Sequence, residues 1–269
     1  MSDSPDTERI AKRIARAGIA SRRDAEAMIL AGRVTVNGLR VARPALNVSP
    51  SDQVAVDGRR VTAPDATRLW RYHKPAGLVT TARDERGRPT VFERLPEEMP
   101  RVLSVGRLDI TSEGLLLLTN NGDLKRRLEL PSTGWLRRDR VRVRGIPDDA
   151  ALEELRHGAR IEGERFRPMQ ITVDRQKGGN SWLTLGLREG RNREIRRALG
   201  SIGLMVNRLI RISYGPFQLG DLARGDVAEV PSRVLRDQLG LPAAVGLAGK
   251  EPRPSAKPAR KRRQLPPQK

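Results

Sequence analysis

The chain has 269 residues, of which 37% are hydrophobic and 3% aromatic, and 52 Lys and Arg against 32 Asp and Glu give it a formal net charge of +20. So many like charges repel one another in a folded protein, which favours a polyanionic partner, most readily nucleic acid. The base composition of the genome would explain why Arg is more frequent than Lys, but not why the net charge is positive. The absence of Cys excludes disulfides and zinc-finger sites, and His73 and His157 are too far apart in the sequence to indicate a histidine metal centre, so no metal is expected.

The N-terminal segment, MSDSPDTERI, is acidic and polar and lacks the apolar core of a signal peptide. The longest apolar runs elsewhere are too short to cross a bilayer. We therefore expect a cytoplasmic protein with no membrane partner.

Residues 8–63 predict a small basic unit. Ile10 and Ile14 are one helical turn apart, and Ser21 with Asp24 resembles a capping box that opens a second helix. Two hairpins with Asn-Gly and Asp-Gly turns follow. This stretch holds 11 Lys and Arg against 5 Asp and Glu. The pattern favours an RNA-binding domain, although a generic basic domain fits it as well.

Residues 64–68 contain Pro and small polar residues and predict a linker. From 69 to 240, strand-like segments alternate irregularly with single helices, which predicts an α+β fold with a mixed, mainly antiparallel sheet rather than a doubly wound one. The clearest expected elements are strands at 102–109, 115–119 and 207–219 and helices at 123–129, from Asp148 or Asp149 to His157, and within 189–204.

Residues 241–269 predict a basic, disordered tail. Its last 20 residues, 250–269, hold 8 Lys and Arg against one Glu, with 5 Pro and almost nothing apolar. Such a composition cannot bury a core, and it suits loose contact with RNA. The expected organisation is therefore a first domain at 1–63, a linker at 64–68, a second domain at 69–240 and this tail.

One carboxylate has an unusual setting. Asp109 follows Arg107 closely and precedes the longest run of leucines in the chain, in VGRLDITSEGLLLLTNNGD. A buried acid costs several kcal/mol unless it is paired or hydrogen-bonded, so Asp109 either binds loop amides or does chemistry. The segment GRNREIRR predicts the end of a basic helix, whose charges either face solvent or take part in a functional site. No phosphate-binding loop, dinucleotide fingerprint or nucleophile elbow is present.

The string GRLDITSEGLLLLTNNGD closely resembles the signature of the ribosomal RNA pseudouridine synthases. The segments HKPAGLVTT, RGRPTVFERLP, EGRNREIRRAL and LIRISYGP agree in order, over residues 8 to about 240. Two of them, RPTVFERLP and RLIRISYG, are most similar to the branch that acts on large-subunit RNA. The first helices and sheet resemble the αL RNA-binding motif that precedes the pseudouridine synthase catalytic domain in this family.

The resemblance implies an isomerase that turns a specific uridine of ribosomal RNA, in the large-subunit 23S rRNA, into pseudouridine without a cofactor. By position in the motif, Asp109 is the essential acid, acting as nucleophile at the anomeric carbon or as base at its neighbour. Arg196 matches the cation that steadies this acid, with Arg191 as the second choice. Arg107 matches a residue that holds the RNA with its target base flipped out.

The same resemblance implies partners and a binding surface. Ribosomal RNA or a ribosome assembly intermediate is the expected partner of a protein that acts as a monomer. Basic residues of the αL-type domain are the expected RNA contacts: Arg13, Arg16, Arg22, Arg23 and Arg33.

One residue departs from the family pattern. Relatives typically carry a Tyr where this chain has Asp139, and that ring is expected to pack on the flipped uracil, an interaction of about 1–3 kcal/mol. Either Tyr72, Trp135 or Tyr214 takes over, or the register shifts here, or activity is weak or absent, or the substitution is engineered. The alternative function is accordingly a catalytically inactive RNA-binding or ribosome-assembly factor; a DNA-binding or generic basic protein has little support.

Overall fold

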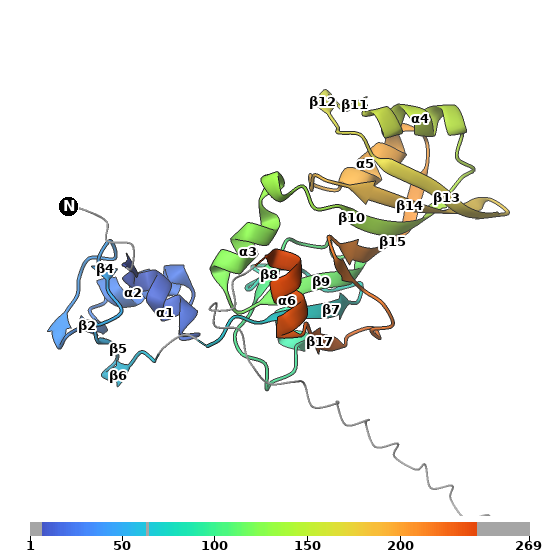
Figure 1. Cartoon of the computed structure of the whole chain (residues 1–269). Coiled ribbons are helices and arrows are strands. Elements are labelled where there is room, and N and C mark those ends of the chain that lie inside the picture. The colour runs from blue at the N-terminus through green and yellow to red at the C-terminus, as the bar shows by residue number, and fades with distance from the viewer. Residues whose placement is uncertain (1–6, 63–64, 241–269) are drawn as a thin grey trace, which may run out of the picture.

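The computed structural model describes residues 7–62 and 65–240, so the expected tail at 241–269 lies outside the described residues. Figure 1 shows a small N-terminal unit beside a larger unit built on one long sheet. The two are bridged by an ion pair of 2.8 Å between Lys12 and Asp123. No helix in the described part of the chain is long and apolar enough to span a membrane.

The N-terminal unit packs two helices against small sheets. Ser21, the N-cap of the helix α2 (Arg22–Leu30), accepts a hydrogen bond from the backbone N–H of Asp24, and the Asp24 side chain accepts from the backbone of Ser21, which confirms the predicted capping box. Asn37 and Asp57 adopt left-handed backbone angles, φ 51° and 49°, that suit the two predicted tight turns. The elements are β1 (Glu8–Arg9), α1 (Ile10–Arg16), α2 (Arg22–Leu30), β2 (Val34–Val36), β3 (Leu39–Arg40), β4 (Asn47–Val48), β5 (Val54–Val56) and β6 (Arg59–Arg60).

The larger unit is organised by a nine-stranded sheet whose main path runs β13-β14-β10-β15-β9-β7-β17. All its strand pairs are antiparallel except β15 with β9. The predicted α+β class with a mixed, mainly antiparallel sheet is therefore confirmed. The strands are β7 (Leu69–Lys74), β8 (Leu103–Val105), β9 (Glu113–Thr119), β10 (Arg137–Arg144), β13 (Gln170–Lys177), β14 (Asn180–Leu187), β15 (Met205–Tyr214), β16 (Phe217–Gln218) and β17 (Val227–Glu229), with a separate hairpin β11 (Arg160–Ile161) and β12 (Glu164–Arg165).

Helices cover different halves of this sheet. The helices α4 (Asp149–His157) and α5 (Glu194–Ser201) pack on β10 and β14, whereas α3 (Gly122–Glu129) and α6 (Ser232–Leu239) pack on β7 and β9. Short 3₁₀ turns lie at Phe92–Arg94 and Pro131–Thr133. Of the two predicted caps for α4, Asp148 is the N-cap. The helix α6 was not expected from the sequence.

The strand β9 explains the run of four leucines at 115–118. All seven of its residues are buried. Leu115 and Leu117 join the core under α3 and α6, while Leu116 and Leu118 join a second core formed with the loop that follows β7. Since both faces of the strand are covered, the leucines need not alternate with polar residues.

The parallel pairing of β9 with β15 forms a seam between the two halves of the sheet. Gly114 faces Arg211 there, with φ +103°, and a Cβ at Gly114 would lie 2.6 Å from the backbone nitrogen of Arg211. Only glycine permits this approach. The loop before β9 carries Asp109, so the strand expected at 102–109 is shorter than predicted and ends at Val105.

Candidate active site

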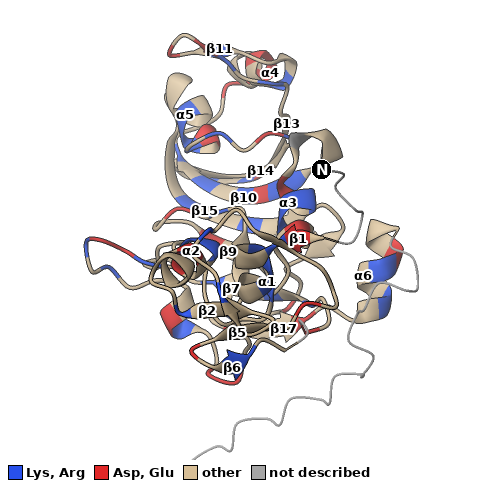
Figure 2. Ribbon diagram, turned by 90° about the vertical axis from the view of Figure 1, so that its left-hand side faces the viewer, with Lys and Arg blue, Asp and Glu red and all other residues tan. Residues whose placement is uncertain are grey.

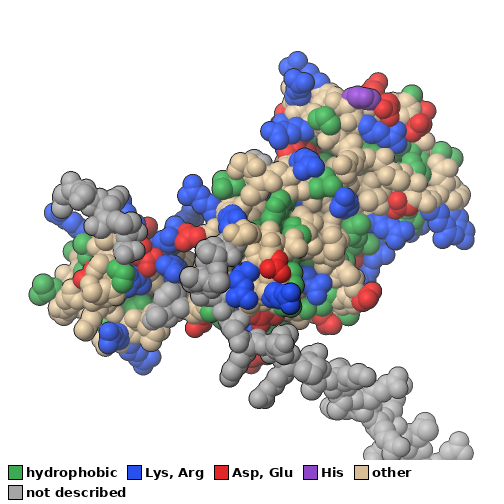
Figure 3. Space-filling view, in the orientation of Figure 1, with side chains coloured by type: hydrophobic (Ala, Val, Ile, Leu, Met, Phe, Trp, Pro, Cys, Tyr) green, Lys and Arg blue, Asp and Glu red, His purple; other side chains and the backbone are tan. Residues whose placement is uncertain are grey.

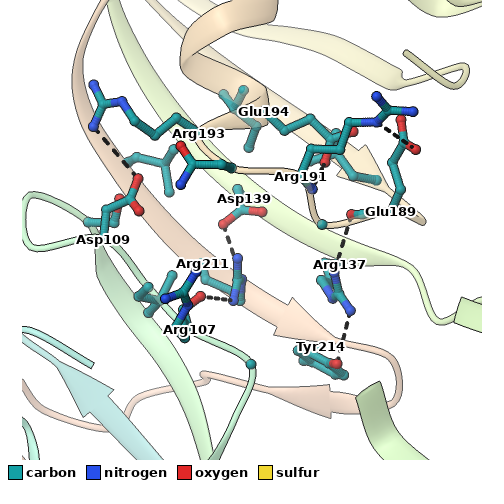
Figure 4. A pocket seen from close by; sticks show the side chains of 18 of the residues that line it. Arg107, Asp109, Arg137, Asp139, Glu189, Arg191, Arg193, Glu194, Arg211 and Tyr214 are labelled. Atoms are coloured by element: carbon teal, nitrogen blue, oxygen red, sulfur yellow. Dashed lines mark hydrogen bonds and ion pairs between the residues drawn. The ribbon is translucent and has the colours of Figure 1, made fainter. Parts of the chain in front are cut away.

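A cavity of about 440 Å³ opens at this seam (Figure 4). Its size is within the usual range for ligand sites. Its wall is formed by the loop before β9, by the first half of β10, by the end of β15 and by residues 187–196, which lead into α5. Segments far apart in the sequence meet here because the parallel strand pair brings the two halves of the sheet together.

Asp109 lies on the wall of this cavity, in the loop between β8 and β9. Its carbonyl oxygen accepts a hydrogen bond from the backbone N–H of Ser112 at 3.0 Å, and another from the ammonium of Lys74 at 3.2 Å. The loop is therefore fixed through its backbone. The carboxylate itself is 39% exposed and is free to face a ligand.

Two guanidinium groups approach Asp109. Arg193 forms an ion pair with its carboxylate at 3.8 Å and has a left-handed backbone, φ 49°, at the N-cap of α5. Arg196 donates hydrogen bonds to the hydroxyl of Thr111 at 3.1 Å and to the carbonyl of Val206 at 2.9 Å. Burial lowers the pKa of Arg196, as does Arg193, while the nearby charge of Asp109 opposes this. Sequence reasoning singled out Arg196 and missed Arg193.

The other predicted arginines lie differently. Arg191 lines the cavity but pairs with Glu189 at 3.1 Å and Glu164 at 3.2 Å, and its bond to Glu189 raises its pKa. Arg107 is exposed on the cavity wall, and its carbonyl accepts a hydrogen bond from Arg211 at 3.4 Å. Within the described residues, neither Arg191 nor Arg107 forms an ion pair with Asp109.

Asp139 is inside the same cavity wall, on β10. It is only 1% exposed, and its Oδ1 lies 3.3 Å from Nε of Arg211 on the neighbouring β15. Burial raises the pKa of Asp139, while the charge of Arg211 and then of Arg137 act against the rise. The acid that replaces the expected aromatic ring is thus one half of a buried ion pair.

The three aromatic residues considered as replacements lie in different places. Tyr214 lines the cavity, and its ring is covered by Arg137 at 4.8 Å from the ring centre. Trp135 packs edge-on against Tyr214 and is not on the cavity wall. Tyr72 is buried in the core on the far side of β9, with burial raising its pKa. Only Tyr214 is near enough to contact a ligand here.

A pair of glutamates, which sequence reasoning also missed, supports the loop before α5. Glu194 is 5% exposed, and burial together with a hydrogen bond to Glu189 raises its pKa to about 8. Burial would likewise raise the pKa of Glu189, but hydrogen bonds from Arg167, Glu194 and Arg191 lower it overall. Glu194 also accepts the backbone N–H of Arg191 at 3.1 Å. A carboxyl group with such a pKa holds its proton at neutral pH.

The cavity gathers most of the unsatisfied polar atoms of the described chain. Among the described residues, eight buried side-chain nitrogen or oxygen atoms lack a hydrogen-bond partner, and five of these atoms belong to residues on the cavity wall. The five are Nε of Arg137, Oδ1 of Asp139, Oε1 of Glu194, Nε of Arg196 and Nε of Arg211. Such concentration marks a site prepared for a polar ligand.

The predicted RNA contacts are all in the N-terminal unit, where some of the arginines are in ion pairs and others are not. Arg13 and Arg16 pair with Glu8 at 2.7 and 3.0 Å, and Arg33 pairs with Asp57 at 2.5 Å. Arg22 and Arg23, at the start of α2, are exposed, and no ion pair involves them within the described residues. Figure 2 shows basic residues along α1, α2, β10 and β15.

A second basic hollow of about 440 Å³ lies between the two units. Figure 3 shows blue side chains gathered on the face where they meet. Six cationic residues line the hollow: Lys12, Arg16, Arg22, Arg101, Lys125 and Arg126. Within residues 7–62 and 65–240, no cluster of three or more His, Asp or Glu could hold a metal ion.

Comparisons with known proteins agree with this architecture. The family described as RNA pseudouridylate synthase matches residues 68–201, and the S4 domain matches residues 8–54. An uncharacterized RNA pseudouridine synthase of Rickettsia prowazekii is 45% identical over 86% of this chain and 97% of its own length. The ribosomal large subunit pseudouridine synthase B of Escherichia coli (strain K12) is 40% identical over 88% of this chain and 84% of its own. A crystal structure of a pseudouridylate synthase has a TM-score of 0.61 and 22% identity, and the match covers 86% of this chain and 99% of that one.

Proposed function

Since the chain belongs to the RNA pseudouridylate synthase family, we propose that it isomerises one uridine of large-subunit ribosomal RNA to pseudouridine, with Asp109 as the essential acid. The substrate is protein-free ribosomal RNA or a ribosome assembly intermediate, and the protein acts as a monomer. The observation that carries this proposal is the position of Asp109. Its backbone is fixed and its carboxylate lines a cavity that is rich in guanidinium groups.

The reaction needs no group beyond these side chains. The bond from the anomeric carbon to N1 breaks, a bond from that carbon to C5 forms, C5 loses one proton and N1 gains one. The carboxylate of Asp109 attacks the anomeric carbon or removes a proton from the adjacent ribose carbon. The guanidinium of Arg193 lies 3.8 Å from the carboxylate of Asp109, and the nearby Arg196 adds a second positive charge to this part of the cavity.

Reaching a uridine inside folded RNA requires flipping it out, which costs a few kcal/mol. Contacts of basic side chains with phosphates offset that cost. Two basic surfaces that share Arg22 are available: the exposed start of α2 with Arg22 and Arg23, and the hollow between the two units. We propose that the RNA backbone follows these surfaces while the target base enters the cavity beside Asp109.

The test is the variant Asp109→Asn, compared with the unchanged chain on ribosomal RNA from cells that lack the gene. Asn keeps the shape of the side chain but removes the charge. We expect pseudouridine, mapped at nucleotide resolution, to disappear while RNA affinity stays within about twofold, because one half-exposed carboxylate adds little to binding. Retained product, or a parallel loss of product and binding, would contradict the role of Asp109.

A second candidate function follows from Asp139. A buried acid in place of a stacking ring favours an RNA-binding or ribosome-assembly factor without activity. This alternative predicts tight, strongly salt-dependent ribosomal RNA binding and no product. Cells lacking the gene are supplied with the chain as it is or with Asp139→Tyr. Pseudouridine restored by the unchanged chain rejects the alternative, and restoration by the Tyr variant alone supports it.

A further inference from the structure

We propose that Asp139 and Arg211 together read the pairing edge of the flipped uracil, with Oδ1 of Asp139 accepting the N3–H and the guanidinium of Arg211 donating to an adjacent carbonyl oxygen. This inference rests on the proposed function and deepens it. The cavity would then select uracil by hydrogen bonds, instead of holding the base by stacking on the Tyr that is expected at position 139.

The first support is the geometry of the pair. Both residues line the cavity that also contains Asp109, and they come from neighbouring strands, β10 and β15 (Figure 4). Oδ1 of Asp139 and Nε of Arg211 are 3.3 Å apart, close enough for an ion pair, yet both atoms lack a well-directed hydrogen bond. An acceptor and a donor are therefore held side by side in the wall.

The second support is the cost of this arrangement. Asp139 is 1% exposed, and a buried ion pair repays its desolvation only when further hydrogen bonds satisfy the remaining polar atoms. In the described chain those bonds are missing for Oδ1 of Asp139 and for Nε of both Arg137 and Arg211. A polar ligand that supplies them would remove the deficit, so the pair fits a binding role better than a purely structural one.

The third support is chemical complementarity. The pairing edge of uracil presents a carbonyl oxygen, then N3–H, then a second carbonyl oxygen. A carboxylate next to a guanidinium presents an acceptor next to donors, which matches two adjacent groups of that edge. Cytosine has a lone pair at N3, which would face the negative oxygen of Asp139. Enzymes that act on flipped bases commonly read this edge by hydrogen bonds.

The alternative is that the pair only holds β10 to β15. The chain contains a matched structural pair for comparison, because Arg140 on β10 lies 3.3 Å from Asp174 on β13, outside the cavity. Removing either acid breaks an ion pair of the same length that has one member on β10, with Asp174 24% exposed and Asp139 1% exposed. Only the loss of Asp139 should alter how the base is recognised.

The experiment uses the full chain and two ribosomal RNA substrates. The modified uridine is first mapped with the unchanged protein, and ligated RNA is then prepared with either uridine or 3-methyluridine at that position. The methyl group removes the N3–H donor and keeps C5 and the ribose. Single-turnover rates of isomerisation are measured by separating the nucleosides, for the unchanged chain, Asp139→Ala, Asp139→Asn and the control Asp174→Ala.

We expect the unchanged chain and Asp174→Ala to prefer uridine over 3-methyluridine by roughly 10- to 100-fold, the worth of a hydrogen bond to a charged group. In Asp139→Ala this preference should fall to within about threefold, and in Asp139→Asn, which keeps the side-chain volume, it should be intermediate. Equal rates on both RNAs with the unchanged chain, or equal preference in all four proteins, would overturn the inference alone. Absence of pseudouridine with the unchanged chain would instead remove the proposed function and this inference with it.

Discussion

Lys74 holds the backbone of Asp109 from inside the protein. Its ammonium donates hydrogen bonds to the carbonyl oxygens of Asp109 at 3.2 Å and Ser112 at 2.8 Å, and to that of Pro75 at 3.0 Å. The side chain of Lys74 is fully buried, and burial lowers its pKa to about 8. The position of the candidate acid therefore depends on a cation that does not contact the cavity.

We predict that Lys74→Met uncouples catalysis from RNA binding. Met fills a similar volume, but three carbonyl oxygens lose the ammonium as a donor, although that of Asp109 keeps the N–H of Ser112; each group left unsatisfied costs about 1–3 kcal/mol. The loop of Asp109 should loosen, so the turnover rate falls by at least about tenfold while RNA affinity is kept. Thermal unfolding and single-turnover kinetics measure the two effects. Unchanged kinetics with a lowered melting temperature would show that the loop does not need this anchor.

The two guanidiniums near Asp109 should differ in importance. Arg193 is 52% exposed and 3.8 Å from the acid, and such surface pairs contribute about 0–1 kcal/mol. Arg196 is half-buried and fixed by Thr111 and Val206. We expect Arg193→Gln to lower the turnover rate by less than about fivefold and Arg196→Gln by more than about tenfold. Arg197→Gln is the control, since Arg197 pairs with Glu162 and Glu164 outside the cavity. The reverse order would assign Arg193 as the partner of Asp109.

The buried carboxyl group of Glu194 should make stability depend on pH. Its pKa is about 8 in the folded state against an ordinary 4.5, so between these values the unfolded chain has lost a proton that the folded chain keeps. Stability must therefore fall as pH rises from about 4.5 to about 8. Above pH 8 the lowered pKa of Lys74 acts in the opposite direction. We predict that Glu194→Gln raises the melting temperature relative to the unchanged chain at pH 8 and only slightly at pH 5. A gain of the same size at both pH values would contradict this.

The N-terminal unit offers a test of RNA contact through salt dependence. Replacing both Arg22 and Arg23 with Ala should lower the slope of log affinity against log salt concentration by about 1 to 2, because each phosphate contact adds nearly one to that slope. Arg33→Ala should change it less, since Asp57 already holds that guanidinium. Filter binding of ribosomal RNA between low and moderate salt measures both. Equal slopes in all three proteins would exclude the start of α2 from the interface.

Much of the fold follows from local sequence signals. The capping box at Ser21, the cap at Asp148 and the tight turns at Asn37 and Asp57 depend on residues a few positions apart, and the structure confirms them. The helix α6 was missed although its buried Leu235 and Leu239 are one helical turn apart. The domain boundaries and the site residues stay predictions.

The composition of the cavity wall could be predicted only in part. Asp109 and Arg196 stand out in the sequence, because a recognisable motif surrounds each. Arg193 and Glu194 lie in the same segment as Arg196, and Arg211 lies in LIRISYGP, but these segments do not show that the three side chains line the cavity, since their place depends on the parallel pairing of β9 with β15 and on the left-handed turn at residue 193. Such long-range register is not encoded in any short segment. The burial of Asp139 likewise emerges only when α5 closes over β10 and β15.

The seam itself gives the last prediction. A side chain at Gly114 would meet the backbone of Arg211, and φ +103° disfavours any residue with a Cβ. Gly114→Ala should lower the free energy of unfolding by about 3 kcal/mol or more and push Arg211 away from Asp139, so activity should drop even where the protein remains folded. Gly200→Ala is the matched control: Gly200 is in α5, nothing lies within 4 Å of the added methyl group, and a gain of about 0.5–1 kcal/mol is expected. Urea unfolding and single-turnover rates measure both variants. Equal stability of the two would mean that β9 and β15 can separate without cost, and the cavity would then lose the close strand contact that brings Asp109 and Arg211 into one wall.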